Sequence, residues 1–213
     1  MLKKYKGTII LTSVIILLPI IAGMILWDKL PAEIATHFGT NNQPDGFSSK
    51  AFAVFGLPFV MLGLHLLCII ATNTDPKNKN ISGKAIGVVL WIIPLTSLIL
   101  MSVTYAYALG IKVRIGFIVI MLLGILFILL GNYMPKTKQN FTFGLRIPWT
   151  LNDEENWVKT HRLAGWLMVG GGAIICATAI FENPFIFFPV VIVMALGPIV
   201  YSYKLHKDKN KEE

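Results

Sequence analysis

The chain has 213 residues, of which 55% are hydrophobic and only 14% carry a charged side chain. Soluble domains average about 25% charged residues, so the composition excludes an ordinary soluble domain, and the length exceeds that of a single membrane anchor. The net charge of +8 does not indicate nucleic-acid binding, because Lys and Arg lie at the ends of apolar runs rather than along one polar face.

Six apolar runs follow one another, at residues 7–27, 51–72, 85–109, 115–131, 163–181 and 184–203. Each has the roughly 17 to 25 residues that a helix needs to cross a bilayer, and backbone groups in lipid must be satisfied within the segment. The sequence therefore predicts an all-α, polytopic membrane protein with about six transmembrane helices. The first run is long for a signal peptide, so we expect it to be retained. Cys68 and Cys176 lie inside these runs and are expected to be inert thiols.

The distribution of Lys and Arg predicts the orientation of the chain. With the N-terminus in the cytoplasm, 15 of the 19 Lys and Arg residues fall on the cytoplasmic side. This bias follows the positive-inside rule and places both termini in the cytoplasm. We divide the chain into an N-terminal two-helix unit (1–72) with an extracellular loop, a middle two-helix unit (73–131), a cytoplasmic loop with the last two helices (132–203), and a charged tail (204–213) that is expected to be frayed.

The extracellular loop at residues 28–50, here called the outer loop, contains a segment, EIATHF, that fits a strand or a single turn. Pro44 and Gly46 favour a turn after it. His37, with Glu33 and Asp45 near it, has two interpretations: a metal ligand, or a hydrogen-bonding partner that fixes the turn. The spacing matches no strong template for metal ligands. A loop of this length also suits the docking of an extracellular partner.

The connection at residues 132–162, here called the inner loop, is dense in polar and aromatic residues. Arg146 and Trp149 are close enough in sequence to stack, or Arg146 can bind a carboxylate. Thr150 or Asn152 is expected to cap a helix that begins at Asp153.

On that helix Asp153, Trp157 and His161 share one face. We expect the helix to lie along the membrane surface before it enters the fifth span. Simpler interpretations stay open: Trp149 and Trp157 are also typical of interfacial anchors, and the acidic run at 153–155 is typical of a helix start.

The sequence contains no GxSxG, HExxH, P-loop or CxxC motif. An enzyme would have to use His161, His37 or a carboxylate such as Glu154, with or without a divalent metal. A membrane-embedded peptidase of this kind is one alternative, and a small transporter with Pro-broken helices is another. His65 lies inside the second apolar run, where a neutral histidine bonded across helices is expected.

A longer pattern joins these residues: GN, then a Pro-Lys pair, then NFTFGLRIPWTL, then Trp157 and THR at helical spacing. This segment resembles the signature of the SdpI family of bacterial membrane proteins. The outer loop, with LPAEIATHF followed by DGFSSK, resembles the N-terminal domain of unknown function that usually accompanies it. Together the resemblance covers nearly the whole chain.

The resemblance implies a multi-pass protein of the bacterial cell membrane that gives immunity against a secreted killing-factor peptide. The best-known member of the family also signals, by drawing a cytoplasmic repressor to the membrane when the toxin is bound. The implied partners are thus an antimicrobial peptide, the lipid membrane and a repressor, with no direct contact to nucleic acid. No cofactor is implied, although a divalent metal stays open. The resemblance implies that His37, Asp45 and Gly46 shape the outer surface, and that the inner surface is shaped by Asn132, Asn140, Gly144, Arg146, Trp149, Thr150, Trp157, His161 and Arg162.

Overall fold

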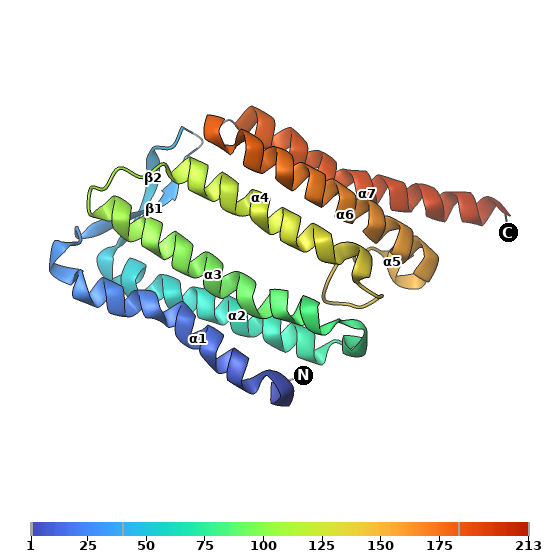
Figure 1. Ribbon diagram of the computed structural model, residues 1–213, viewed down its shortest axis with the longest axis horizontal. Coiled ribbons are helices and arrows are strands. Elements are labelled where there is room, and N and C mark those ends of the chain that lie inside the picture. Colours follow the sequence, from blue (N-terminus) through green and yellow to red (C-terminus); the bar gives the residue numbers. More distant parts are fainter. Residues whose placement is uncertain (1, 40, 183, 213) are drawn as a thin grey trace. The chain divides into compact units, whose positions relative to one another are not determined.

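The structure is a computed structural model, and it describes residues 2–39, 41–182 and 184–212. Within these ranges six helices are long and apolar enough to cross a membrane (Figure 1), which confirms the predicted all-α, polytopic fold. They are α1 (Leu2–Ile25), α2 (Leu57–Thr74), α3 (Gly83–Ala108), α4 (Ile115–Tyr133), α6 (Glu154–Thr178) and α7 (Pro184–Glu212).

Short elements join the spans. A π-helical turn, η2 (Phe52–Gly56), leads directly into α2, and the short helix α5 (Pro148–Asn152) lies within the inner loop. Single 3₁₀ turns follow α1, α4 and α6: η1 (Trp27–Lys29), η4 (Met134–Lys136) and η5 (Ala179–Phe181). A fourth, η3 (Asn78–Asn80), lies within the α2–α3 connection.

The outer loop folds into a β-hairpin. Strands β1 (Glu33–Phe38) and β2 (Pro44–Ser49) pair antiparallel, with irregular register near the turn. The Gly39 amide donates to the Gln43 carbonyl at 2.9 Å and closes the turn. The segment EIATHF is therefore a strand, one of the two conformations that its sequence allowed.

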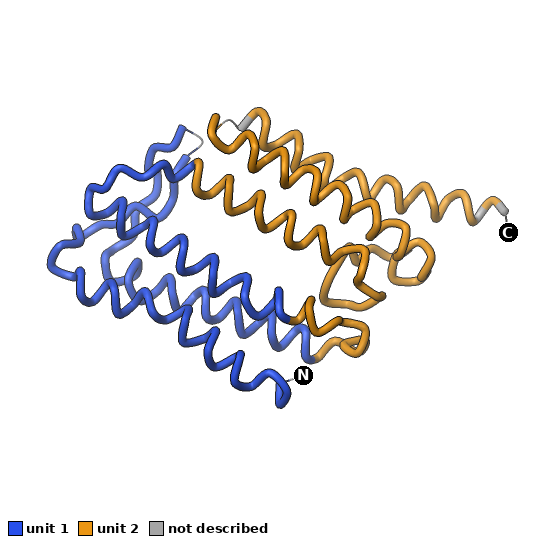
Figure 2. The backbone as a smooth tube through the Cα atoms, in the orientation of Figure 1, with its two compact units in different colours: residues 1–73, 87–116 blue, residues 74–86, 117–213 orange. Residues whose placement is uncertain are grey.

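The chain forms two compact units (Figure 2). Unit 1 consists of Met1–Asn73 and Gly87–Gly116, and it contains the hairpin with α1, α2 and most of α3. Unit 2 consists of Thr74–Ile86 and Phe117–Glu213, and it contains the α2–α3 connection, the inner loop and helices α4 to α7.

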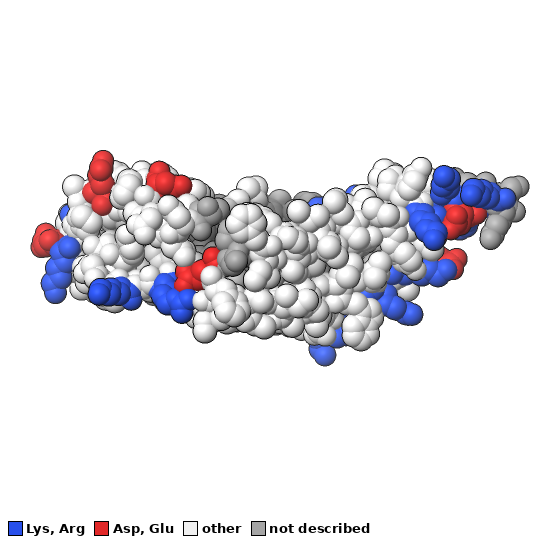
Figure 3. All heavy atoms as spheres, turned by 90° about the horizontal axis from the view of Figure 1, so that it is seen from above, with Lys and Arg blue, Asp and Glu red and all other residues white. Residues whose placement is uncertain are grey.

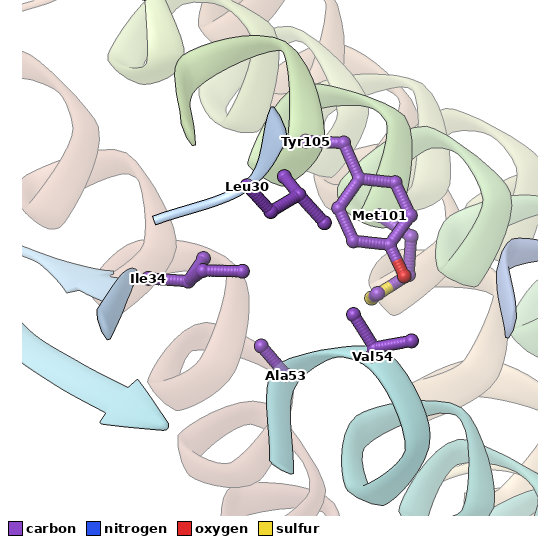
Figure 4. Close-up of a cluster of buried hydrophobic side chains, with 6 residues drawn as sticks. All are labelled: Leu30, Ile34, Ala53, Val54, Met101 and Tyr105. Carbon is purple, nitrogen blue, oxygen red and sulfur yellow. The ribbon is translucent and has the colours of Figure 1, made fainter. Parts of the chain in front are cut away.

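An apolar cluster fixes the hairpin to the helices of unit 1. Ile34 of β1 points toward residues of α3 and of the π-helical turn before α2, as Figure 4 shows. Burying an aliphatic side chain of this size contributes roughly 1.5 to 3 kcal/mol. The cluster therefore fastens the hairpin to the adjoining ends of two spans. Its buried members are Leu30, Ile34, Ala53, Val54, Met101 and Tyr105.

Polar contacts join the helices of unit 1. Thr12 Oγ1 of α1 and Nε2 of His65 of α2 lie 3.0 Å apart, and both residues are fully buried. This is the histidine bonded across helices that the sequence predicted. Tyr105 of α3 donates its hydroxyl hydrogen to the Pro19 carbonyl of α1 at 3.0 Å.

Glycines allow helices α4 and α6 to pack closely together in unit 2. A Cβ atom added to Gly172 would lie 2.7 Å from the Gly124 carbonyl oxygen, and one added to Gly165 would lie 2.8 Å from the Gly131 carbonyl oxygen. Real Cβ atoms do not approach so closely, so the two backbones pack directly on each other. Small residues give membrane helices this close packing, since van der Waals contact replaces the hydrophobic effect in lipid.

The flanks of the long helices are apolar. Phe185 and Ile25 are 86% and 77% exposed, and the face drawn in Figure 3 has a broad surface without Lys, Arg, Asp or Glu between its charged regions. Apolar side chains at such exposure are stable against lipid tails, whereas backbone polar groups are satisfied within each helix.

Two expectations about helix ends are wrong. Helix α6 is continuous from Glu154 into the predicted fifth span, so the segment expected to lie along the membrane surface is the first part of that span. Helix α7 continues through the tail that was expected to be frayed, and residue 213 lies outside the described residues. Lys209 on the tail pairs with Asp153 at the start of α6 at 2.9 Å.

Candidate functional site

The inner loop folds inward on itself. Four of its predicted site residues are almost fully buried, three are exposed, and Gly144 and Trp149 are intermediate. The buried ones are Asn140, Thr150, Trp157 and His161, and the exposed ones are Asn132, Arg146 and Arg162.

Trp157 and His161 form the centre of the inner loop. They are one helical turn apart on α6, and their rings stack with centroids 3.9 Å apart and planes 20° apart. The Trp157 indole N–H donates to the Thr137 carbonyl at 2.7 Å. Trp157 has no exposed surface, so the interpretation of this residue as an interfacial anchor is wrong.

Both ring nitrogens of His161 are used by the loop. The Leu145 amide donates to Nε2 at 3.0 Å, so Nε2 is the unprotonated acceptor. Nδ1 then carries the hydrogen and donates to the Trp157 carbonyl at 2.8 Å. These two bonds fix one neutral tautomer. The imidazole holds the loop against α6 and has no lone pair left for a proton or a metal.

Gly144 is required where the loop passes over His161. Its φ is +113°, in the region that residues with a Cβ rarely adopt. A Cβ added there would also overlap Nε2 of His161. Glycine at this position therefore lets the backbone reach the imidazole.

Asn140 and Thr150 complete the internal bonding of the loop. Asn140 Oδ1 accepts from the Thr142 and Phe143 amides at 2.9 and 2.6 Å, which makes a tight turn. The Thr150 hydroxyl donates within the segment that leads into α5, with the Leu145 carbonyl 2.8 Å away. Both side chains are fully buried, so they shape the loop from within.

Asp75, from the α2–α3 connection, is a site residue that sequence reasoning missed. Its Oδ2 accepts from the Phe141 amide at 2.8 Å and from the Thr142 hydroxyl at 2.7 Å. Its Oδ1 accepts from the Lys77 amide at 2.7 Å, and the side chain is only 5% exposed. The available signal was a single acidic residue, the Asp of the DPK that follows an apolar run, and this pattern also fits a solvated turn.

Gln139 strengthens the same connection. Its amide oxygen accepts from Lys77 Nζ at 2.6 Å, and its backbone carbonyl accepts from the Asn80 side chain at 2.7 Å. Its amide nitrogen donates to the Thr150 and Leu151 carbonyls at 2.9 and 2.7 Å. The α2–α3 connection, the inner loop and α5 thus share one hydrogen-bonded network.

The N-cap of α6 is Asp153, and the prediction of Thr150 or Asn152 is wrong. The extended backbone of Asp153 (φ −134°, ψ 115°) separates α5 from α6, and its Oδ1 accepts from the Glu155 and Asn156 amides. Bonding to Lys209, together with these amides, lowers the pKa of Asp153.

A cleft of about 270 Å³ opens beside this cap, between the start of α6 and the end of α7. The Glu155–Lys159 ion pair, 2.7 Å long, lies on its α6 side. Its lining is Asp153, Glu155, Asn156, Lys159, Leu205, Asp208 and Lys209.

Arg146 and Trp149 each have a partner of their own. Arg146 Nη1 donates to the Phe141 carbonyl at 2.6 Å, and the side chain is exposed. The Trp149 ring packs against Tyr203 and His206 of α7, with centroids 5.6 and 6.0 Å away. The Arg146 guanidinium thus lies at the surface of the loop, whereas the Trp149 ring is packed against α7.

In the outer loop, His37 and Asp45 are brought together. Nδ1 of His37 lies 2.5 Å from Oδ1 of Asp45, and both side chains are more than half exposed. Gly46 lies opposite His37, where a Cβ would come within 2.8 Å of the His37 Cβ. Glu33 is at the other end of β1, opposite Ser49. Across the described part of the chain, no three His, Cys, Asp or Glu side chains are grouped as a metal site.

The fold and the inner loop define a class of protein: a multi-pass helical membrane protein with a self-bonded polar loop between its fourth and fifth spans. Residues 136–202 match the SdpI/YfhL protein family, and residues 14–62 match a domain of unknown function (DUF1648). The chain is 30% identical over 208 residues to the Immunity protein SdpI of Bacillus subtilis (strain 168), which covers 94% of this chain and 97% of that protein. The chain therefore belongs to the SdpI family and is a multi-pass membrane protein of bacteria. No solved structure matches it.

Proposed function

We propose that this chain is a membrane immunity protein that protects a bacterium against a secreted antimicrobial peptide. The similarity to Immunity protein SdpI, which extends over 97% of that protein, carries the proposal. The buried bonding around His161 and Gly144 supports it, because that bonding gives the inner loop a defined structure that a partner can recognise.

The test is protection of a sensitive cell. The chain is expressed in a Bacillus subtilis strain that lacks its own SdpI, and survival is measured after addition of the killing-factor peptide, with Bacillus subtilis SdpI as the positive control. We expect survival well above that of cells with an empty vector. Full sensitivity of cells whose membranes contain the protein would contradict the proposal.

Binding and degradation of the peptide are distinguished in the same cells. Mass spectrometry of the recovered peptide is expected to find it intact. A peptidase that relies on His161 is disfavoured, because both of its ring nitrogens are already bonded and the residue is only 1% exposed. Fragments that appear only in cells with the protein would favour the peptidase.

We further propose that the exposed face of the inner loop holds a cytoplasmic repressor when the peptide is bound. Arg146 and Arg162 support this role, because their guanidinium groups are exposed on a loop that is otherwise bonded internally. Guanidinium groups bind carboxylates in a fixed, two-point geometry.

The test of this second role is peptide-dependent capture of a DNA-binding protein by the membrane-embedded chain. Capture is expected to need the peptide and to be lost in the Arg146→Glu, Arg162→Glu variant. The Lys3→Glu, Lys4→Glu variant is a matched control, since it makes the same charge change at the exposed start of α1. Equal capture by all three proteins would contradict a role for this face.

A further inference from the structure

We propose that Asp75 is a positioning residue of the inner loop, and that through α2 and α3 it couples the loop to the outer hairpin. The inference rests on the proposed function, since it names how an outer surface would regulate the inner one. Asp75 lies between the two segments that match family descriptions, residues 14–62 and 136–202.

The first step is the packing of the hairpin against α2 and α3. Ile34 of β1 is 1% exposed and packs in one cluster with Val54, at the start of the α2 span, and with Met101, near the end of α3. The Phe38 ring meets the Tyr107 ring edge to face, with centroids 5.0 Å apart. A change in the hairpin therefore acts on both helices at once.

The second step is the covalent connection at the opposite ends of the same helices. Helix α2 ends at Thr74 and α3 begins at Gly83, so residues 75–82 join them. This connection belongs to unit 2, whereas α2 and most of α3 belong to unit 1. Coupling between distant sites is carried by packed side chains, hydrogen-bond networks and rigid secondary elements such as these helices.

The third step is the attachment of that connection to the inner loop. The Asp75 carboxylate accepts two hydrogen bonds from the loop, from the Phe141 amide and the Thr142 hydroxyl, while its other oxygen is bonded to the Lys77 amide of its own turn. Bonds to an ionised acceptor are about twice as strong as neutral ones. Lys77 also lies over the Phe141 ring, 5.5 Å from its centroid.

The fourth step is the place where the attachment acts. Phe141 and Thr142 lie in the turn that Asn140 makes, immediately before Gly144 and the bond from Leu145 to His161. A displacement of Asp75 displaces this turn through the bonds to Phe141 and Thr142. The position of the turn determines whether the Leu145 amide stays bonded to the His161 imidazole. Arg146, which donates to the Phe141 carbonyl, moves with it.

The test is a double-mutant cycle that uses no peptide toxin. A Leu145→Cys reporter is placed in a Cys68→Ala, Cys176→Ala background, and its rate of reaction with N-ethylmaleimide is measured in nanodiscs. Ile34→Ala loosens the hairpin cluster, and Asp75→Asn removes an acceptor oxygen without a change of size. Ile34→Val is the milder variant for the case that Ile34→Ala does not fold.

We expect Ile34→Ala to speed labelling several-fold when Asp75 is present and to have little further effect in the Asp75→Asn background. We expect the combined effect of the two substitutions on the labelling rate to differ about threefold or more from the product of their separate effects. The effects of distant, uncoupled sites simply multiply. The control is Asp153→Asn, which changes a carboxylate that caps α6 instead of bonding to the Phe141 turn; the effect of Ile34→Ala is expected to survive there.

Two results would overturn the coupling. One is that neither Ile34 variant changes the labelling rate. The other is that Ile34→Ala changes this rate by the same factor in the presence of Asp75 and in the Asp75→Asn background. Either result leaves the immunity assay untouched, because no toxin is involved. Conversely, a failure of protection in cells leaves the labelling cycle valid.

Discussion

The replacement Gly144→Ala tests the structure of the inner loop most directly. Two effects add. A residue with a Cβ at φ +113° stores strain of about 1–3 kcal/mol. The new Cβ also overlaps His161 Nε2, and displacement of the imidazole leaves the partly buried Leu145 amide without its acceptor, at about 1–3 kcal/mol.

The expected loss of stability is therefore about 2–6 kcal/mol. For chains of this size, each kcal/mol shifts Tm by roughly 2–4 °C, so Tm should fall by at least about 4 °C. Thermal unfolding of the detergent-solubilised protein, followed by tryptophan fluorescence, measures this. Protection of cells should fall with it, since the loop no longer rests on α6.

Gly170→Ala is the matched control. Gly170 is on α6, as is His161, and a Cβ added there meets nothing within 4 Å. Alanine is favoured over glycine in a helix interior by roughly 1 kcal/mol, so this variant should unfold at the wild-type Tm or above. A Gly144→Ala variant with wild-type Tm, or an equal fall in both variants, would refute the reasoning about the loop.

Three further predictions address the rest of the molecule. The pKa of Asp153 is lowered in the folded protein by Lys209 and the cap amides. Its contribution to stability is therefore complete above the ordinary aspartate pKa of about 3.9 and is lost as the pH falls through the lower folded value. Asp153→Asn should accordingly flatten the acid side of the stability profile, and an unchanged profile would contradict the pairing. Gly172→Leu should separate α4 from α6, because even a Cβ there lies 2.7 Å from the Gly124 carbonyl oxygen; a folded protein yield equal to wild type would argue against this packing. In intact cells, a membrane-impermeant maleimide should label Phe47→Cys in the hairpin but not Arg146→Cys, in the cysteine-free background, and labelling of Arg146→Cys would reverse the predicted orientation.

The six spans could be predicted from the sequence alone. Lipid offers no hydrogen bonds, so every spanning segment must be a helix of about 20 apolar residues, and such runs are visible without any tertiary information. The turn predicted at Pro44 and Gly46 is wrong: both residues lie in β2 and pair with β1, and the hairpin turn comes before them, where Asn42 has a φ of 61°. Local turn preferences do not determine strand register, which depends on pairing with β1.

The interior of the inner loop was decided only by tertiary structure. The sequence places Trp157 and His161 on one helical face, but their burial depends on Thr137 and Leu145, which reach them from elsewhere in the chain. Asp75 is the clearest case. Its carboxylate is indistinguishable in sequence from a solvated turn residue, and its role comes from two loop donors 66 and 67 residues away. Hydropathy is a property of each segment, whereas hydrogen bonding between distant segments exists only once the chain has folded.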